Sequence, residues 1–355
     1  MSTAASPKPS PRPTVAPALA PWLQRQLAQL LTQRGHALLL AGPSGLGQFD
    51  LSLALARAWL CEQPTPHGAC GRCGACHAID VRTHAELLVL LPDVLALPWG
   101  WPIDPNMAKK IESKEAKPSK WIRVEAARRV VEFAQTTRGR GAVKVVLVYP
   151  AERLNVESAN TLLKTLEEPA GDVRFVLATE SAHALPATIR SRCQTHALTW
   201  PDEAQALAWL QTCQPELDEA AWRVWLQAAG GRPSDALAWA SRGLDPAVWA
   251  QLPKAIALGQ ADALLSTWAA ADQLAVLQKL CHDLMAVAVG AAPRFFAAAH
   301  LPPAPTLHTL QAWAKTLNDT ARTVEHPFHA ALALDAWLAG AQRVWSVPEK
   351  SHRSI

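Results

Sequence analysis

Apolar positions along the first two hundred residues follow two different periods. Short runs in which almost every residue is apolar occur at residues 37–41, 86–91, 143–149 and 174–178. The segments between these runs carry apolar residues three or four positions apart, which is the spacing of an amphipathic helix. Strands that alternate with helices favour a parallel sheet. The pattern therefore predicts an α/β parallel-sheet domain over residues 21–200.

The second half of the chain has no further strand-like runs. Residues 203–211 and 218–228 have helical spacing, and Pro233 is placed to begin another helix. The remainder is rich in Ala, Leu and Trp and keeps a helical pattern. We therefore expect a small helical domain at residues 201–245 and an all-helical domain at residues 246–355.

Two segments lack a pattern that would pack. Residues 1–20 are rich in Pro, Ser and Ala and lack the contiguous apolar core of a secretory signal, so we expect a flexible tail. Residues 92–120 are rich in Pro and Lys and are long for a packed connection, which predicts a mobile surface insertion. Its five lysines fit a solvated loop better than a phosphate-binding surface.

Composition narrows the class of protein. Half of the 355 residues are hydrophobic and 18% are charged, which indicates a folded, largely helical protein of two or three domains. The net charge of +4 is mild, so it permits nucleic acid nearby without arguing for a dedicated nucleic-acid binder. No window approaches the roughly 18 apolar residues of a membrane helix. We expect a cytoplasmic protein without a membrane segment.

A cluster of cysteines is the clearest candidate for chemistry. Four of the seven cysteines, Cys61, Cys70, Cys73 and Cys76, lie within sixteen residues. Four thiolates can enclose one Zn²⁺ tetrahedrally, and such a closed shell is structural because it has no open position for catalysis. The spacing leaves open free thiols or a redox pair of Cys73 and Cys76. Weaker substitutes for Cys61 as a ligand are His67, His77 and His84.

The stretch "GPSGLGQFD" follows the first predicted strand, where a phosphate-binding loop belongs. Gly42, Gly45 and Gly47 keep the glycines whose backbone N–H groups curl around phosphates. Gln48 stands where the loop's lysine would be, and Phe49 stands where a Ser or Thr would hold Mg²⁺. The loop is therefore expected to be a degenerate one that holds nucleotide weakly or not at all.

A second loss falls at the end of the strand at residues 143–149. An ATPase of this architecture normally places Asp-Glu there to hold Mg²⁺ and polarise water, whereas this chain has Tyr149 and Pro150. Glu152 is expected to be an exposed loop acid. The two losses together predict that this chain does not hydrolyse nucleotide.

The stretch from Asn155 to Gln194 ends with two arginines. Asn155 can cap a helix whose apolar positions form one face and which ends near Pro169. Arg190 and Arg192 then lie near the end of a short helical pattern. Composition alone favours ordinary ion-pair partners for both of them.

The motifs resemble, in this order along the chain, the delta-prime subunits of bacterial DNA polymerase III clamp loaders: "GPSGLGQ", the four-cysteine cluster, "ERLNVESANTLLKTLEEP" and "TIRSRCQ". The resemblance covers residues 21–200 and continues only as helical character beyond them. It implies an AAA+ (P-loop NTPase-like) domain with an inserted zinc module at residues 61–76, a lid at 201–245 and an oligomerising collar at 246–355. "LLKTLEEP" and "SRC" also occur in the gamma/tau ATPase subunits, so the degenerate loop decides for delta-prime.

The resemblance also implies roles and partners. Arg192 would reach a neighbour's ATP in trans, while Arg190 is a structural neighbour. Ser234 replaces the lid arginine of active subunits. The implied partners are gamma/tau and delta subunits and, through the complex, the sliding clamp and primer–template DNA during replication. The alternatives are an active gamma/tau-type ATPase and a zinc-dependent DNA-binding protein.

Overall fold

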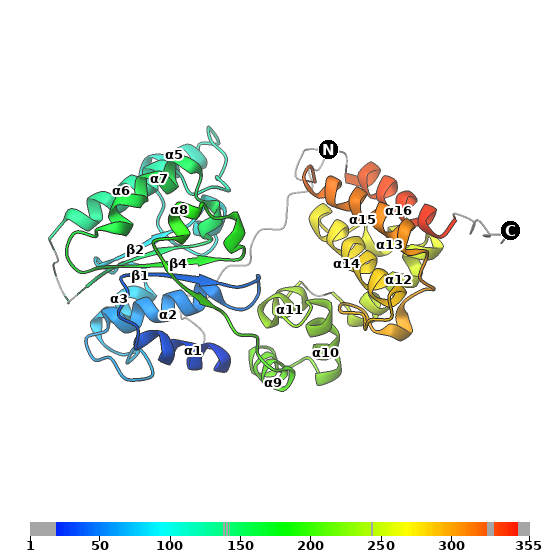
Figure 1. The fold of residues 1–355 in the computed structure, drawn as a ribbon, viewed down its shortest axis with the longest axis horizontal. Helices are drawn as coiled ribbons and strands as arrows, with labels where there is room; N and C mark the ends of the chain where they lie inside the picture. The colour runs from blue at the N-terminus through cyan, green and yellow to red at the C-terminus, as the bar shows by residue number, and fades with distance from the viewer. Residues whose placement is uncertain are drawn as a thin grey trace. The chain divides into compact units, whose positions relative to one another are not determined.

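The structure is a computed structural model that describes residues 19–137, 139, 141, 143–242, 244–324 and 330–346. It divides into two compact units, the first ending at Gln205 and the second beginning at Ala206 (Figure 1). All but the last two residues of the predicted tail at 1–20 lie outside the described residues, as do the last nine of the chain.

The first unit contains a five-stranded sheet with the order β2-β3-β4-β1-β5. Every neighbouring pair is parallel. The strands are β1 Ala37–Ala41, β2 Leu87–Leu90, β3 Lys144–Val148, β4 Val173–Thr179 and β5 Gln194–Ala197. The prediction of a parallel α/β domain is confirmed, because each of the four expected apolar runs forms a strand.

Strand β5 is the strand that the apolar pattern missed. It lies at the edge of the sheet beside β1, with Leu38 opposite Gln194. Its sequence, QTHA, has one apolar residue, and none of its side chains is buried. An edge strand that is held mainly by backbone pairing to one neighbour leaves little hydrophobic pattern in a sequence.

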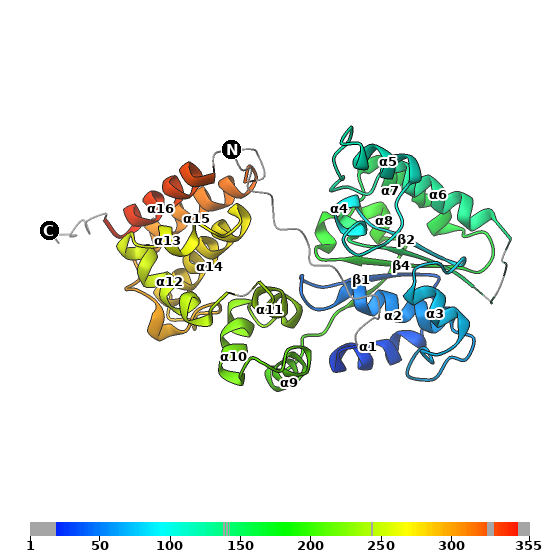
Figure 2. The same cartoon turned by 180° about the vertical axis from the view of Figure 1, so that it is seen from behind.

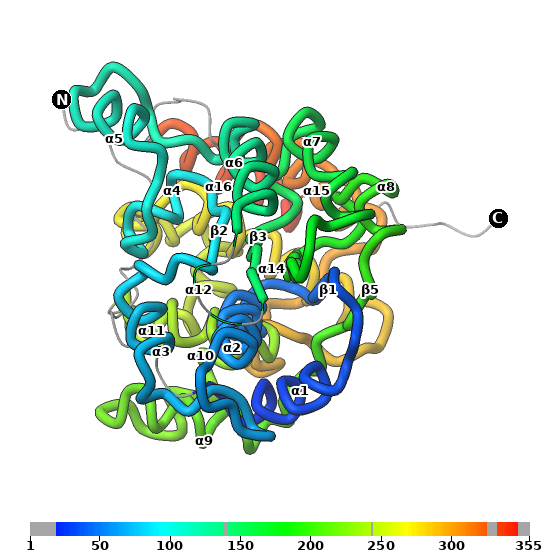
Figure 3. Tube along the Cα trace, turned by 90° about the vertical axis from the view of Figure 1, so that its left-hand side faces the viewer, coloured from blue at the N-terminus to red at the C-terminus, as the bar shows by residue number. Residues whose placement is uncertain are grey.

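Helices cover both faces of this sheet (Figures 1, 2 and 3). One layer holds α1 Pro21–Leu31, α2 Gln48–Leu60 and α3 Gly74–Asp80; the other holds α6 Val124–Gln135, α7 Val156–Glu167 and α8 Ala187–Arg190. Strand β3 serves both layers, because Val146 and Val148 pack in the core beneath α6 and α7 while Leu147 packs with α2. The alternation of side chains along a strand produces this division. The short helices η1 Ala151–Arg153 and η2 Ala182–Ala184 follow β3 and β4.

The segment at residues 92–120 corrects one prediction. It contains helices α4 Asp93–Ala96 and α5 Pro105–Glu112. Trp99 and Trp101 are buried against Phe49 of α2, and Asp93 is buried and pairs with Arg123 at 3.2 Å. The expectation of an unpacked surface insertion is therefore wrong for residues 92–103, because two tryptophans supply the apolar surface that the surrounding prolines and lysines conceal. The mobility expected of the remainder stays a prediction.

The second unit is helical throughout its described residues. Its helices are α9 Glu203–Cys213, which begins just before the boundary, α10 Glu219–Ala228, α11 Pro233–Ala240, α12 Pro246–Leu258, α13 Asp262–Leu265, α14 Ala270–Ala288, η3 Ala298–His300, α15 Leu307–Ala321 and α16 Ala330–Ser346. One hydrophobic core runs from Ala206 to Val344. The predicted division into lid and collar at residue 245 stays a prediction. Among the described residues, no helix combines the length and apolar character that crossing a membrane requires.

Lys279 lies inside an aromatic cluster of the second unit. Its Nζ lies 4.6 Å from the ring centre of Trp239, 5.2 Å from that of Trp249 and 5.4 Å from that of Phe295, and it donates a hydrogen bond of 2.7 Å to the carbonyl of Ala228. This arrangement ties α14 to the end of α10 through cation–π contacts and a helix C-terminus. Burial, reinforced by the charge of Arg232, lowers the pKa of Lys279 to about 8.

The contribution of Lys279 to the stability of this unit is expected to rise with pH between about 8 and 10.5, while the raised pKa of the buried Cys281 thiol opposes this rise above about 9. In that window the folded chain has released the Lys279 proton that the unfolded chain still holds, so the free energy of unfolding increases, by up to about 3 kcal/mol. Tryptophan-fluorescence unfolding at several pH values measures this slope. Lys279→Met should lose the slope, whereas Lys315→Met, at an exposed position of α15, should keep it; equal slopes in all three proteins would contradict the prediction.

Candidate functional site

The loop between β1 and α2 keeps the backbone of a phosphate-binding loop. Gly45 and Gly47 have φ angles of 77° and 94°, in the left-handed region that favours glycine. A Cβ on Gly47 would lie 2.6 Å from Leu23 Cδ1, and Leu46 between the two glycines is fully buried. The glycine bend is therefore needed to join the strand to the helix, whether or not the loop binds a phosphate.

The side chain of Gln48 is buried and hydrogen-bonds across the loop between β1 and α2. Its Nε2 donates hydrogen bonds of 2.6 Å to the carbonyl oxygens of Gly42 and Pro43, and the residue is 2% exposed. A lysine at this position would present a cation to phosphate oxygens. Gln48 presents a neutral amide instead, and that amide is already paired with the loop's own carbonyl groups.

An aromatic cluster occupies the region beside the loop where a metal ion would be held. Phe49 is 2% exposed, and its ring centre lies 5.0 Å from that of Trp99, 6.3 Å from that of Trp101 and 5.5 Å from that of Tyr149. Phe49 lies in the first turn of α2 and Tyr149 follows β3, so the two positions that would supply Mg²⁺ ligands meet as packed rings. Mg²⁺ requires oxygen ligands, and the Tyr149 hydroxyl, which donates to Glu180, is the one oxygen on these four side chains.

Glu152 corrects a second prediction, because it is not an exposed loop acid. Its Oε2 accepts a hydrogen bond of 2.6 Å from the Thr179 hydroxyl, and its Oε1 accepts one of 3.1 Å from the backbone N–H of Glu180. The short helix η1 turns the side chain back over the end of β4, a placement that the sequence did not reveal. The Tyr149 hydroxyl donates to Glu180 Oε1 at 2.8 Å. Both oxygens of Glu152 are thus engaged within the chain.

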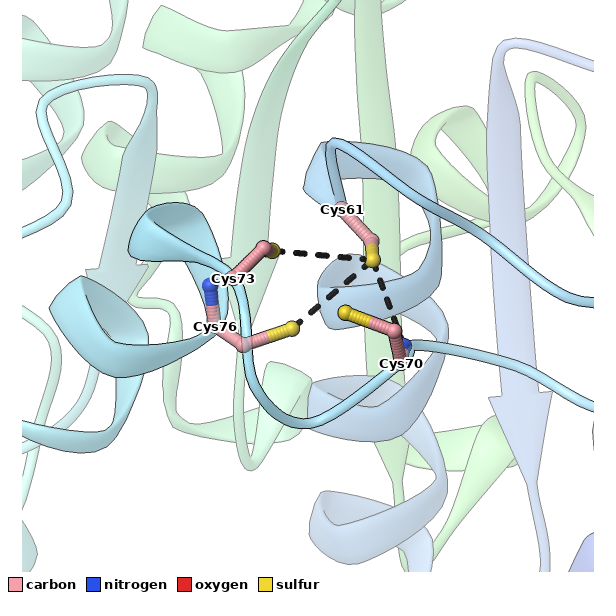
Figure 4. A group of neighbouring side chains, drawn as sticks. All are labelled: Cys61, Cys70, Cys73 and Cys76. Atoms are coloured by element: carbon pink, nitrogen blue, oxygen red, sulfur yellow. Dashed lines mark hydrogen bonds between the residues drawn. The ribbon is translucent and has the colours of Figure 1, made fainter.

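The four cysteines converge on one point (Figure 4). Cys61 follows α2, Cys70 lies in the next loop, Cys73 caps α3 and Cys76 lies in its first turn. Their Sγ atoms all lie within 4.8 Å of one another, and Cys61 Sγ is 3.8 Å from the Sγ atoms of Cys73 and Cys76. A tetrahedral site with metal–sulfur bonds of about 2.3 Å needs sulfur atoms about 3.8 Å apart. The cluster could therefore bind a metal ion.

The surroundings favour the thiolate at Cys73 and oppose it at Cys76. Burial opposes the thiolate of Cys73, but backbone N–H groups of Cys76 and Glu62 and neighbouring thiols outweigh it and lower its pKa to about 6. Burial raises the pKa of Cys76 to about 12 in the absence of a cation. Cys61 is part of the cluster, so no histidine is needed in its place, and His84 instead accepts a hydrogen bond of 3.1 Å from the N–H of Glu86.

Arg192 lies in the turn after α8, at the surface of the first unit. Its Nη2 and Nε lie 3.1 Å and 3.2 Å from Glu167 Oε2, and Nη1 donates to the carbonyl of Thr188 at 3.0 Å. The register places Gln194, two residues later, opposite Leu38 near the amino end of β1, whereas the glycine loop follows the carboxyl end. The structure therefore does not bring Arg192 to the loop of its own chain.

The remaining predicted positions are less distinctive. Arg190, the last residue of α8, is exposed. Ser234 lies in the first turn of α11, and Arg232 pairs with Asp235 at 2.6 Å. Sequence reasoning missed Glu167, although it lies in the "LEEP" stretch, because a partner 25 residues away leaves no local pattern. It also missed the packing of Trp99 and Trp101 against Phe49, which the two tryptophans of "PWGW" could have indicated.

The strand order and the glycine loop between β1 and α2 define a parallel α/β protein that keeps the backbone of a phosphate-binding loop. Residues 17–201 match the family described as DNA polymerase III, delta subunit, and the chain belongs to this family. It is 37% identical over 201 residues to DNA polymerase III subunit delta' of Pseudomonas aeruginosa, which covers 57% of this chain and 54% of that protein. It is 33% identical over 265 residues to subunit delta' of Yersinia pestis, which covers 73% and 68%.

These relatives confirm the resemblance to delta-prime subunits of the clamp loader. The chain spans a little over half the length of the first curated relatives that it matches. Among solved structures, a DNA polymerase III gamma subunit-related protein of Thermotoga maritima aligns over 90% of this chain and 99% of that chain, with 16% identity and a TM-score of 0.45. A score this low adds nothing to the argument.

Proposed function

We propose that this chain is a non-hydrolysing delta-prime subunit of a DNA polymerase III clamp loader, which supplies Arg192 to the ATP of a neighbouring gamma/tau subunit. The observation that carries the proposal is the contrast between the two ends of the sheet. Gln48 and the aromatic cluster of Phe49 close the chain's own loop, while Arg192 stands at the surface away from it. The Arg192 guanidinium lies too far from the loop of its own chain to contact a phosphate there, but from the surface it would contact the ATP of an adjoining subunit.

The chemistry suits a guanidinium. Charge develops on the phosphoryl oxygens during transfer, and a planar fork of N–H donors neutralises it with defined geometry. By family resemblance, the complex with gamma/tau and delta subunits opens the sliding clamp and places it on primer–template DNA. The helices beyond residue 245 would form the collar that holds the ring together, and those at 201–245 the lid.

The four-cysteine cluster supports a structural Zn²⁺ site in this proposal. Cys61, Cys70, Cys73 and Cys76 would be its ligands, and four sulfur atoms would leave no position for a reacting water. The ion would hold α3 against the end of α2. Its role would be to stabilise the first unit, and no step of ATP hydrolysis involves it.

The alternative of an active gamma/tau-type ATPase is disfavoured by the same loop. That alternative predicts that the purified wild-type chain hydrolyses ATP. We expect instead that Gln48→Lys with Phe49→Thr leaves the purified chain without Mg²⁺-dependent ATPase, because Tyr149 and Pro150 still provide no carboxylate. Removing the Phe49 ring should also lower stability by about 3–5 kcal/mol, since it leaves a cavity between Trp99 and Tyr149.

ATPase assays and denaturant unfolding of the purified wild-type and double-variant chains measure both effects. The single variant Gln48→Lys separates the loss of the amide from the loss of the ring. Hydrolysis by the wild-type chain in the absence of other subunits would contradict the proposal that this subunit is inactive alone. Hydrolysis by the double variant only would contradict the expectation that Tyr149 and Pro150 prevent activity.

A further inference from the structure

The ion pair between Arg192 and Glu167 has an unusual setting. Glu167 is the last residue of α7, where a carboxylate meets the negative end of the helix dipole. Such a carboxylate is favourable only beside a cation, and Arg192 is the cation in contact with it. The neighbouring carboxylate of Glu168 makes no ion pair within the described part of the chain. Of the two neighbouring acids, Glu167 is therefore the one that contacts Arg192.

The contact fixes one edge of the guanidinium. Glu167 Oε2 accepts hydrogen bonds from Nε and Nη2 at 3.2 Å and 3.1 Å, while Nη1 donates to the carbonyl of Thr188 at 3.0 Å and to the hydroxyl of Ser191 at 3.4 Å. The second N–H of Nη2 makes no hydrogen bond in the part of the chain that the structure describes. The side chain of Arg192 is 29% exposed, so the group is held in place at the surface with donor capacity remaining.

The pair contributes little to stability. The side chain of Glu167 is 57% exposed, and ion pairs in such surroundings are weak because water and salt screen them. A long flexible side chain that must meet a phosphoryl group at one position benefits from being held beforehand, because the ordering is then not required when the neighbour's nucleotide arrives. The ion pair with Glu167 therefore serves to orient the Arg192 side chain and adds little to stability.

We infer that Glu167 is a positioning residue for Arg192: it holds the guanidinium by its Nε/Nη2 edge, so that the remaining N–H of Nη2 faces a neighbour's nucleotide. This inference rests on the proposed function. It adds that turnover by the assembled complex depends on the Glu167 carboxylate, although Glu167 itself touches no substrate.

The test uses the reconstituted clamp-loader complex with the wild-type chain and five variants of it: Glu167→Ala, Glu167→Gln, Glu168→Ala, Arg192→Ala and the double variant Glu167→Ala/Arg192→Ala. We expect Glu167→Ala to lower kcat for DNA-stimulated ATP hydrolysis about 10-fold. The KM for ATP, complex assembly and the melting temperature should not change, because the neighbour binds the nucleotide and the ion pair is exposed. Glu168→Ala should behave as wild type, and Glu167→Gln, which keeps an oxygen acceptor, should be intermediate.

The double variant decides between positioning and a general structural role. If Glu167 acts through Arg192, removing Glu167 has no further effect once Arg192 is gone. An equal loss in both backgrounds, or a kcat for Glu167→Ala at or above the wild-type value, would overturn the inference. If kcat falls with Arg192→Ala but not with Glu167→Ala, the inference about Glu167 is wrong and the proposed function still stands. Unchanged turnover with Arg192→Ala would overturn the proposed function as well.

Discussion

Replacing Arg192 by alanine is expected to slow ATP hydrolysis about 10³-fold at the one interface that this chain completes, while the complex still assembles. Trans arginines that stabilise the charge of a transferring phosphoryl group are worth roughly 10³–10⁵ in rate. Among the described residues, Arg192 hydrogen-bonds to the exposed Glu167, to the carbonyl of Thr188 in α8 and to the hydroxyl of Ser191, so its loss leaves the buried core intact. Single-turnover hydrolysis and the rate of clamp loading by the reconstituted complex measure the effect.

Arg190→Ala is the matched control for this experiment. Arg190 is an exposed arginine two positions away in the same segment. It should leave both rates near the wild-type value. An intact complex with Arg192→Ala and undiminished turnover would show that the finger assignment is wrong.

Loss of the metal from the cysteine cluster should have the second large effect. We expect one Zn²⁺ per purified chain and none in the variant Cys73→Ser/Cys76→Ser. Zn²⁺ binding by small four-ligand sites is worth about 10–16 kcal/mol at neutral pH, and this free energy is coupled to folding. Helix α3 has seven residues, too few to be stable by itself, so it should unfold when the ion is lost.

Metal analysis and hydrogen exchange of residues 61–80 measure this prediction. Cys213→Ser is the control, because Cys213 is exposed and lies outside the cluster. It should keep both the metal and the protection of α3. A metal-free chain with a fully protected α3 would show that the four thiols hold the segment without an ion.

The closed loop explains how a protein can keep a phosphate-loop backbone without its chemistry. Leu46 and the positive φ of Gly47 serve the junction of β1 with α2, which the fold needs in any case. The side chains that follow carry no such requirement. Gln48 satisfies carbonyl groups of the loop, and Phe49 packs on Trp99. The fold requires the loop backbone, whereas only nucleotide chemistry requires the catalytic side chains. The backbone can therefore remain while those side chains are replaced.

Much of the candidate site was readable from the sequence because its chemistry is local. Cys70, Cys73 and Cys76 are close along the chain, so their convergence follows from two short turns. The change from Lys to Gln48 is visible at a single position. The roles of Glu152 and Glu167 were hidden, because their partners are 27 and 25 residues away and reach them through the fold.

By itself, the sequence determined the strands predicted at 37–41 and 174–178, the helical second half, the cysteine cluster and the absence of a catalytic lysine and carboxylate. These properties depend on residue type and short-range periodicity. Only the tertiary structure decided the edge strand β5, the packing of Trp99 and Trp101 on Phe49, and the partner of Arg192. Each of these is a contact between segments distant along the chain, and such contacts arise from packing that no local pattern records.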